Sequence, residues 1–202
     1  RIGRNSLVGA GALDDERDSK DQCARLVRLS RDRIVARLPF GERGSAENLA
    51  FSPNRNTPRV AVTNYNGDYS ARVYDITDPE HPNPAAILRG HAFHVWSASF
   101  SPTGRVLATS SMDETICLWD MDGSEREYAR AGDLAAGIRS DTLRGHSEGV
   151  TGIAFTSTTG LSIASCSGDF SVRLWNLRTR EKAFGDASDG TDGHIRAGSV
   201  EQ

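Results

Sequence analysis

The sequence predicts an all-β fold assembled from repeated antiparallel units. Residues 88–120 contain three runs rich in β-branched, aromatic or small apolar residues, and turn-forming residues separate these runs. The runs expected to form strands are Val95–Phe100, Val106–Thr109 and Thr115–Trp119. Much the same pattern returns from Leu143 onward. Such a recurrence indicates a repeat architecture, in which neighbouring units bury one another's apolar faces.

The part of the chain before this segment is expected to form two units. Residues 1–40 form a truncated first unit that lacks its innermost strand. Its expected strands are Ser6–Gly11, Cys23–Leu29 and Arg33–Leu38. Residues 41–88 form a second unit, because Leu49–Pro53 repeats the pattern of Ala98–Pro102. Its last strand, Ala85–Leu88, follows a proline-rich linker that suits an extended surface segment and excludes a central strand.

The remaining chain is expected to form two further units and a connector. Residues 89–143 form the third unit, in which the polar stretch 121–139 is an insertion before the last strand. Loops carry function more often than frame strands do, so this insertion is a candidate contact segment. Residues 144–184 form the fourth unit. Residues 185–202 are expected to be a flexible, acidic connector and the start of a next unit.

The third and fourth units carry the same motif, and its Asp and Trp stand at the same spacing in both. A Gly-His pair precedes the first strand, a Trp ends the third strand, and an Asp stands six residues before that Trp. The pairs are Gly90-His91 with Trp119 and Gly145-His146 with Trp175. With these motifs the chain resembles the WD40-repeat family, whose units are four-stranded blades set radially in a β-propeller. The resemblance implies about four blades of an incomplete ring, which further sequence or a second copy would complete.

The resemblance also implies a hydrogen-bonded tetrad in each of these two units. The members are His91, Thr109, Asp113 and Trp119 in one unit, and His146, Ser165, Asp169 and Trp175 in the other. Ser111 and Ser167 share the strand faces of Thr109 and Ser165, so the choice of hydroxyl stays open. The residue types suit a self-satisfying network, because indole only donates, carboxylate only accepts, and hydroxyl and neutral imidazole do both.

The second unit departs from this motif. We expect Glu42, Asn64 and Tyr74 at the positions of the His, the hydroxyl and the Trp, whereas Asp68 is kept. Two carboxylates that lie close together repel or share a proton. We therefore expect this blade to be the looser one.

Two alternative interpretations of these residues are catalysis and metal binding. His, Ser and Asp are the components of a catalytic triad. However, a duplicated constellation is typical of a scaffold, and no nucleophile-elbow motif is present. His81, His91 and His94 suggest a metal site, but no Cys or acidic residue stands at ligand spacing. We therefore expect no catalysis, no metal and no cofactor.

Composition narrows the classes of partner and compartment. The 24 basic and 27 acidic residues argue against a general nucleic-acid binder. No apolar run approaches the ~18 residues of a membrane span. Cys23, Cys117 and Cys166 form no metal or redox spacing, which favours an intracellular protein of the cytoplasm or nucleus. The start has neither a signal-peptide core nor an initiator Met, so we expect an excerpt of a longer protein.

The function implied by the resemblance is a non-catalytic scaffold for protein–protein interaction, which presents loops and the starts of inner strands to protein partners. The candidate contact residues are Phe93, His94, Trp96, Ser147 and Glu148. Trp96 suits packing between blades equally well. The alternative function is a regulatory or sensor WD40 module of a larger signalling NTPase or kinase, because the stretch DITDPEHPNPAAILRGH at residues 75–91 resembles the linkers of WD40 arrays attached to bacterial NTPase or kinase proteins.

Overall fold

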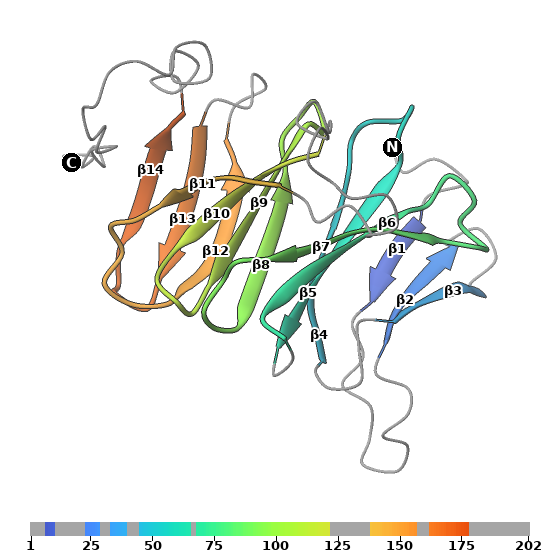
Figure 1. The fold of residues 1–202 in the computed structure, drawn as a ribbon, viewed down its shortest axis with the longest axis horizontal. Coiled ribbons are helices and arrows are strands. Elements are labelled where there is room, and N and C mark those ends of the chain that lie inside the picture. Colours follow the sequence, from blue (N-terminus) through green and yellow to red (C-terminus); the bar gives the residue numbers. More distant parts are fainter. Residues whose placement is uncertain are drawn as a thin grey trace.

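The computed structural model describes residues 7–10, 23–28, 33–39, 45–65, 68–121, 138–156 and 162–177. This part of the chain is all-β, without a helix, and forms four antiparallel sheets that follow one another in chain order (Figure 1). The sheets stand face to face like blades, and the described part does not close into a ring. In the same ranges, no helix is long and apolar enough to cross a membrane.

The sheets contain three or four described strands each. The first sheet contains β1 (Leu7–Ala10), β2 (Cys23–Arg28) and β3 (Arg33–Pro39). The second contains β4 (Ser45–Phe51), β5 (Arg59–Tyr65), β6 (Ser70–Asp75) and β7 (Asn83–Arg89). The third contains β8 (Val95–Phe100), β9 (Val106–Ser111), β10 (Ile116–Asp120) and β11 (Ile138–Leu143). The fourth contains β12 (Val150–Phe155), β13 (Ser162–Ser167) and β14 (Val172–Asn176).

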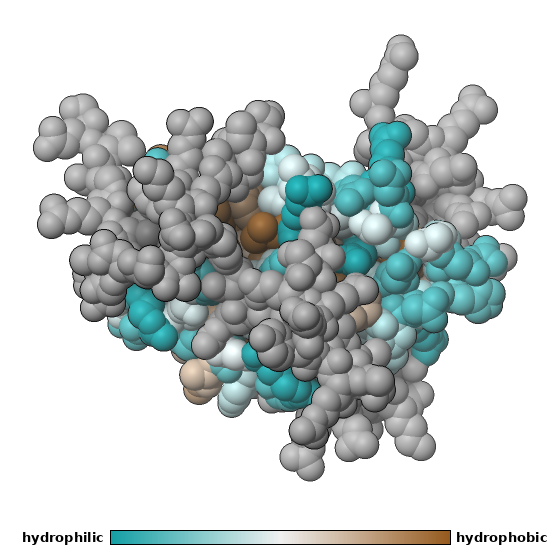
Figure 2. Space-filling view, turned by 45° about the horizontal axis from the view of Figure 1, so that its top comes forward, coloured by the Kyte–Doolittle hydropathy of each residue, from teal (hydrophilic) through white to brown (hydrophobic). Residues whose placement is uncertain are grey.

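The strands of the third sheet are apolar on both faces because a sheet covers each face. Alternate residues of a strand point to opposite faces. On β9, Leu107 packs towards the second sheet and Ala108 packs towards the fourth. On β10, Trp119 packs towards the second sheet and Leu118 towards the fourth. On the face of the molecule that Figure 2 draws, the coloured surface is mainly hydrophilic and little of it is brown.

Polar links join neighbouring blades. The inner strand β8 packs against β4, and β12 packs against β8. The amide of Ala98 donates to Oδ1 of Asn48 at 3.4 Å, and the amide of Phe155 donates to Oγ of Ser99 at 3.4 Å. Nη1 of Arg59 donates to the carbonyl of Met121 at 2.5 Å. The blades are therefore held in register by hydrogen bonds as well as by apolar packing.

Each of the inner strands β4, β8 and β12 begins with a register shift. The shifts fall between Ala46 and Leu49, between Val95 and Ser97, and between Val150 and Gly152. Such a bulge increases local twist and re-aims the side chains beside it. The starts of the inner strands, where the predicted contact residues lie, therefore share one irregular geometry.

One predicted strand begins earlier than expected, and other predicted segments lie outside the described residues. The start of β7 at Asn83 brings Pro84 into a strand, which is compatible with its position at the outer edge of the sheet. Residues 122–137 of the predicted insertion, the connector 185–202 and the fourth strand of the last blade lie outside the described residues. The proposed unit boundaries at residues 40, 88, 143 and 184 stay predictions.

Candidate functional site

The third blade contains a connected network of four buried or half-buried side chains. Nε1 of Trp119 donates to Oγ1 of Thr109 at 2.8 Å, and the same oxygen lies 2.8 Å from Nε2 of His91. Nδ1 of His91 lies 2.9 Å from Oδ2 of Asp113. Because these residues come from β10, β9, the loop before β8 and the β9–β10 turn, the network ties that loop to the strands and to the turn.

The carboxylate of Asp113 also organises the backbone around it. Oδ2 accepts from the amide of Ala92 at 2.8 Å. Oδ1 accepts from the amide of Thr115 at 3.0 Å and from its hydroxyl at 2.6 Å. One carboxylate thus fixes both the β9–β10 turn and the loop before β8.

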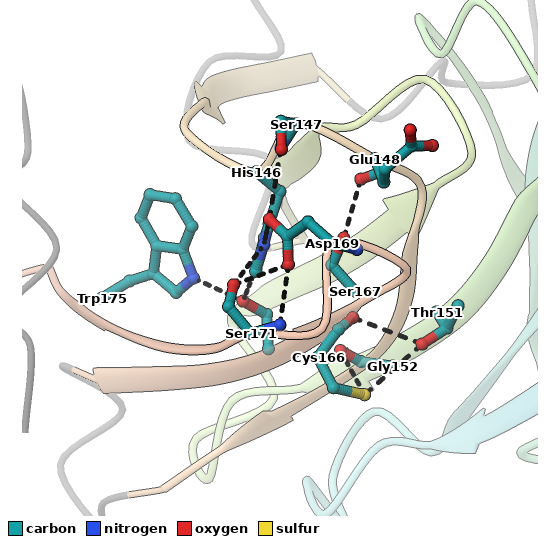
Figure 3. A network of polar contacts seen from close by, with 11 residues as sticks. His146, Ser147, Glu148, Thr151, Gly152, Cys166, Ser167, Asp169, Ser171 and Trp175 are labelled. Atoms are coloured by element: carbon teal, nitrogen blue, oxygen red, sulfur yellow. Dashed lines mark hydrogen bonds and ion pairs between the residues drawn. The ribbon is translucent and has the colours of Figure 1, made fainter.

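The fourth blade repeats this arrangement (Figure 3). Nε1 of Trp175 donates to Oγ of Ser165 at 2.7 Å, and Nε2 of His146 lies 2.8 Å from that oxygen. Nδ1 of His146 lies 2.8 Å from Oδ2 of Asp169, which also accepts from the amide of Ser147 at 3.2 Å. Gly145 permits this approach, because a Cβ there would lie 3.3 Å from the Trp175 ring and its φ is +151°.

The sequence left open whether Thr109 and Ser165 or Ser111 and Ser167 complete the tetrads, and in the structure the two pairs have separate roles. Thr109 and Ser165 bind the indole and the imidazole, as described above. Ser111 instead donates to the carbonyl of Phe93 at 3.1 Å and accepts from the amide of Asp113 at 3.0 Å. Ser167 does the same with the carbonyl of Glu148, at 2.9 Å. These serines therefore brace the loops that carry the predicted contact residues.

Sequence reasoning missed the hydroxyl residues Thr115 and Ser171. Each donates through both its amide and its hydroxyl to the tetrad Asp of its own blade. The signal was available, because a hydroxyl residue stands two positions after the Asp in both blades. Ser70 occupies the same position after Asp68 and donates to that carboxylate.

The hydrogen bonds shift the pKa values of the tetrad. Burial raises the pKa of Asp113, but the His91 imidazole and the Thr115 hydroxyl outweigh burial and hold it well below its usual range. Burial lowers the pKa of His91, but Asp113 and the Cys117 thiol raise it, with a net value of about 9. The Ser171 hydroxyl and the His146 imidazole likewise keep the pKa of Asp169 well below its usual range. Both carboxylates are therefore ionised at neutral pH.

The fourth-blade network has the connectivity of a Ser-His-Asp triad but not its accessibility. The Ser165 residue is 2% exposed and His146 is 5% exposed. The Ser165 oxygen also accepts the indole N–H of Trp175. A nucleophilic oxygen must reach a substrate carbonyl, and this oxygen is enclosed by protein atoms.

The second blade replaces the network with a different one. In the third blade, Trp119 pairs with Leu107, and the tetrad hydroxyl residue stands two positions after Leu107. In the second blade, Tyr74 pairs with Val60, so the residue at the equivalent position, two after Val60, is Val62. The prediction that Asn64 takes this position is wrong, because the face and register are set by strand pairing. Asn64 is the counterpart of Ser111, and both polar atoms of its side chain are buried without a partner.

The remaining members of the second-blade motif also bind elsewhere. Asp68 accepts from Ser70 and lies 2.7 Å from Nη1 of Arg89 and 3.5 Å from Nη2 of Arg72. Burial raises the pKa of Asp68, but the Ser70 hydroxyl and the two arginines outweigh burial, so the pKa lies below its usual value. The hydroxyl of Tyr74 donates to the carbonyl of Pro39 in the first blade. Glu42 lies outside the described residues.

The predicted contact residues lie at or just before the starts of the inner strands β8 and β12, and they differ in exposure. Phe93 is 41% exposed, and Ser147 and Glu148 are exposed, whereas His94 is buried. Trp96 lies in the β8 bulge, half-buried, and its indole N–H is buried without an acceptor. Within the described ranges, no group of three or more His, Cys, Asp or Glu residues is placed to hold a metal ion.

Comparison with known proteins gives the family of the repeats. The family described as "WD domain, G-beta repeat" matches residues 82–120 and 137–176. These residues contain most of the third blade and of the described fourth blade, including both indoles of the networks.

Individual relatives match over part of their length. The chain is 32% identical over 115 residues to "Denticleless protein homolog" of Danio rerio, covering 55% of this chain and 16% of that protein. It is 27% identical over 168 residues to "Probable cytosolic iron-sulfur protein assembly protein 1" of Mycosarcoma maydis, covering 68% and 36%. It is 34% identical over 99 residues to "Nuclear distribution protein PAC1" of Ajellomyces capsulatus, covering 48% and 19%. The chain thus spans 16% to 36% of these relatives.

Proposed function

The chain is a WD40-repeat protein, and from that premise we propose that it is a non-catalytic scaffold that binds partner proteins. The observation that carries this proposal is the pairing of a buried, rigid network with an exposed loop. In the third blade, Asp113 and Ser111 fix the loop that ends in Phe93. In the fourth blade, Asp169 and Ser167 fix the loop that contains Ser147 and Glu148. Rigid loops lower the entropy cost of binding a partner.

The polar chemistry of the tetrads supports a structural role and argues against catalysis. In the fourth blade, the Ser165 oxygen is hydrogen-bonded to His146 and Trp175, and the Ser165 residue is only 2% exposed. The same arrangement occurs in two blades, whereas an active site needs only one. The energetic role is to satisfy buried polar groups, because leaving one unpaired costs about 1–3 kcal/mol.

We also propose that the protein works inside the cell. Cys117 is a buried free thiol and Cys166 is an exposed free thiol, which suits a reducing compartment. One relative carries the word "cytosolic" in its name and another the word "nuclear", which supports the same compartments for this chain.

Site-specific photo-crosslinking tests the scaffold proposal. A photo-reactive phenylalanine analogue replaces Phe93, and a control protein carries it at Phe51, a 36% exposed residue at the opposite end of the inner strand β4. In lysate from the source cells, the analogue at position 93 should crosslink to a defined set of proteins, and the analogue at position 51 should not. Equal crosslinking patterns, or none at position 93, would overturn the proposal for this surface.

A further inference from the structure

A line of exposed and half-exposed apolar side chains runs across the blades at the end that carries His91 and His146. Tyr69 stacks on Phe93, with ring centroids 5.5 Å apart and planes at 15°. Phe93 and Tyr65 also contact the buried ring of His94, at centroid distances of 4.5 and 4.2 Å. The amide of Met112, a 47% exposed residue, donates to the carbonyl of His94 at 2.9 Å.

The backbone of the fourth blade adjoins the end of this line at Met112. A Cβ added to Gly149 would lie 3.1 Å from Cα of Met112, so the two backbones are in contact. The amide of Gly168 donates to the carbonyl of Gly149 at 3.0 Å, which joins the next turn. We name the surface formed by Tyr69, Phe93, Met112 and Gly149 the Phe93 ridge.

The Phe93 ridge is attached to rigid parts of the molecule. The carbonyl of Phe93 accepts from Ser111, whose oxygen also accepts from the amide of Asp113 in the tetrad. Tyr69 occupies the turn position that Glu114 occupies in the next blade, and both have positive φ values of 53° and 68°. Such φ values cost energy in residues other than glycine, so the turns hold these side chains in fixed directions.

Acidic side chains border the ridge. Glu114 lies two residues after Met112, and Glu148 directly precedes Gly149; both are exposed, and neither makes an ion pair within the described residues. The carboxylate of Glu148 points away from the tetrad (Figure 3). On the other side, Arg89 is held by Asp68 at 2.7 Å. The border therefore presents negative charge to a partner.

We propose that the Phe93 ridge binds an extended, arginine-bearing segment of a partner protein. A guanidinium can stack on the exposed ring of Phe93 or the half-exposed ring of Tyr69 and can pair with a carboxylate at the border. An apolar side chain beside the arginine packs on Met112. An acidic segment or a nucleic-acid backbone would meet like charge at Glu114 and Glu148. This inference rests on the proposed scaffold function and assigns the chemistry of its partner.

The test uses the whole chain and an array of short synthetic peptides of randomised order. One set contains arginine and leucine, a second contains lysine in place of arginine, and a third contains glutamate. We expect binding to be enriched in the arginine set and weaker in the lysine set. Phe93→Ala, and separately Glu114→Gln with Glu148→Gln, should weaken the best peptide at least about tenfold. Phe51→Ala, an exposed phenylalanine at the other end of the inner strands, should leave the affinity unchanged.

The possible outcomes separate this inference from the scaffold proposal. Enrichment of acidic peptides, enrichment of none, or binding that Phe93→Ala leaves unchanged would overturn the ridge assignment. If position 93 still crosslinks to partner proteins in that case, the scaffold function stands and only the partner chemistry is wrong. If crosslinking fails as well, the scaffold proposal fails with it. Circular dichroism melts of Phe93→Ala separate lost binding from lost folding.

Discussion

At the scale of single residues, the tetrads show how donor and acceptor counts select residue types. The indole of Trp119 is 0% exposed, so its N–H needs an acceptor inside the protein. Thr109 supplies that acceptor and also contacts the imidazole of His91. The other imidazole nitrogen in turn binds Asp113. A residue with the same donors and acceptors can take the place of another in the network, as Ser165 does at the position of Thr109.

Thr109→Val should destabilise the third blade with almost no change in side-chain volume. The substitution leaves the Trp119 N–H and Nε2 of His91 without their shared partner, which should cost about 1–3 kcal/mol of unfolding free energy. Urea unfolding followed by tryptophan fluorescence measures the difference.

The neighbouring residue gives the control for this prediction. The hydroxyl of Ser110 is buried and has no hydrogen-bond partner. Ser110→Ala should therefore be neutral or stabilising, although it removes a hydroxyl from the same strand. Equal losses from the two substitutions would mean that the tetrad hydroxyl has no special role.

The pKa shifts predict a pH dependence that Asp113→Asn should change. The pKa of Asp113 is lowered in the folded protein, so its stabilisation is present above its unfolded pKa of about 4 and is lost as the pH falls below that value. The pKa of His91 is raised to about 9, so its contribution is lost as the pH rises through that value. The His91 contribution is complete only below its unfolded pKa of about 6.5. Unfolding free energies of wild type and Asp113→Asn, measured at several pH values, should therefore differ most between about pH 4 and 6.5, differ less as the pH rises towards 9, and converge in acid.

The tetrad members could be predicted from sequence because the resemblance to WD40 repeats implies them, and because the hydroxyl, the Asp and the Trp keep one spacing in two units. The choice between Thr109 and Ser111 could not, because both lie on one face and only the position of the indole along the strand separates them. The position of Asn64 was mispredicted for the same reason. Alternation along one strand shows which face of the sheet a residue lies on. The pairing with the neighbouring strand decides which residue it meets there.

At the scale of the blade, the second sheet shows that the fold tolerates loss of the tetrad when other contacts replace it. Val62 takes the place of the hydroxyl and packs in an apolar cluster with Tyr74 and Leu26. Asp68 keeps the turn but pairs with Arg89, at the end of the outer strand. Apolar packing and a surface-facing ion pair thus substitute for a buried polar network.

Val62→Thr, the reverse of Thr109→Val, should therefore destabilise the second blade. The new hydroxyl would face a Tyr whose own hydroxyl donates to Pro39, so it would be buried without the indole that Thr109 has. The expected cost is about 1–3 kcal/mol, measured by the same urea titration. A neutral result would show that a hydroxyl here finds a partner, and that the blade retains part of the motif.

The strands were predictable from residue type and turn signals, whereas the bulges were not. Alternation marks which residues share a face, and the predicted strand Val95–Phe100 agrees with β8. The shift between Val95 and Ser97 is a property of how β8 pairs with β9, which the local sequence of β8 does not encode. As a result, the sequence left the role of Trp96 open.

At the scale of the molecule, equivalent positions in successive blades differ in whether a neighbour covers them. One residue before the blade aromatic stand Val73, Leu118 and Leu174, which are 1%, 6% and 44% exposed. Three residues before it, Ile116 is 0% exposed and Val172 is 75% exposed. The outer face of the fourth blade therefore has the composition of a buried inter-blade face but is exposed to solvent.

The chain should self-associate through this face, because contiguous exposed apolar surface of this kind is removed from water by a second molecule. Val172→Thr combined with Leu174→Thr should shift the sedimentation profile towards the monomer. The pair should change the unfolding free energy little, because substitutions of exposed residues usually stay within about 0.5 kcal/mol. Leu118→Thr makes the same change at the covered counterpart and should cost about 2 kcal/mol or more without reducing association. If the double variant associates as the wild type does, another surface drives the contact and the outer face of the fourth blade has no part in it.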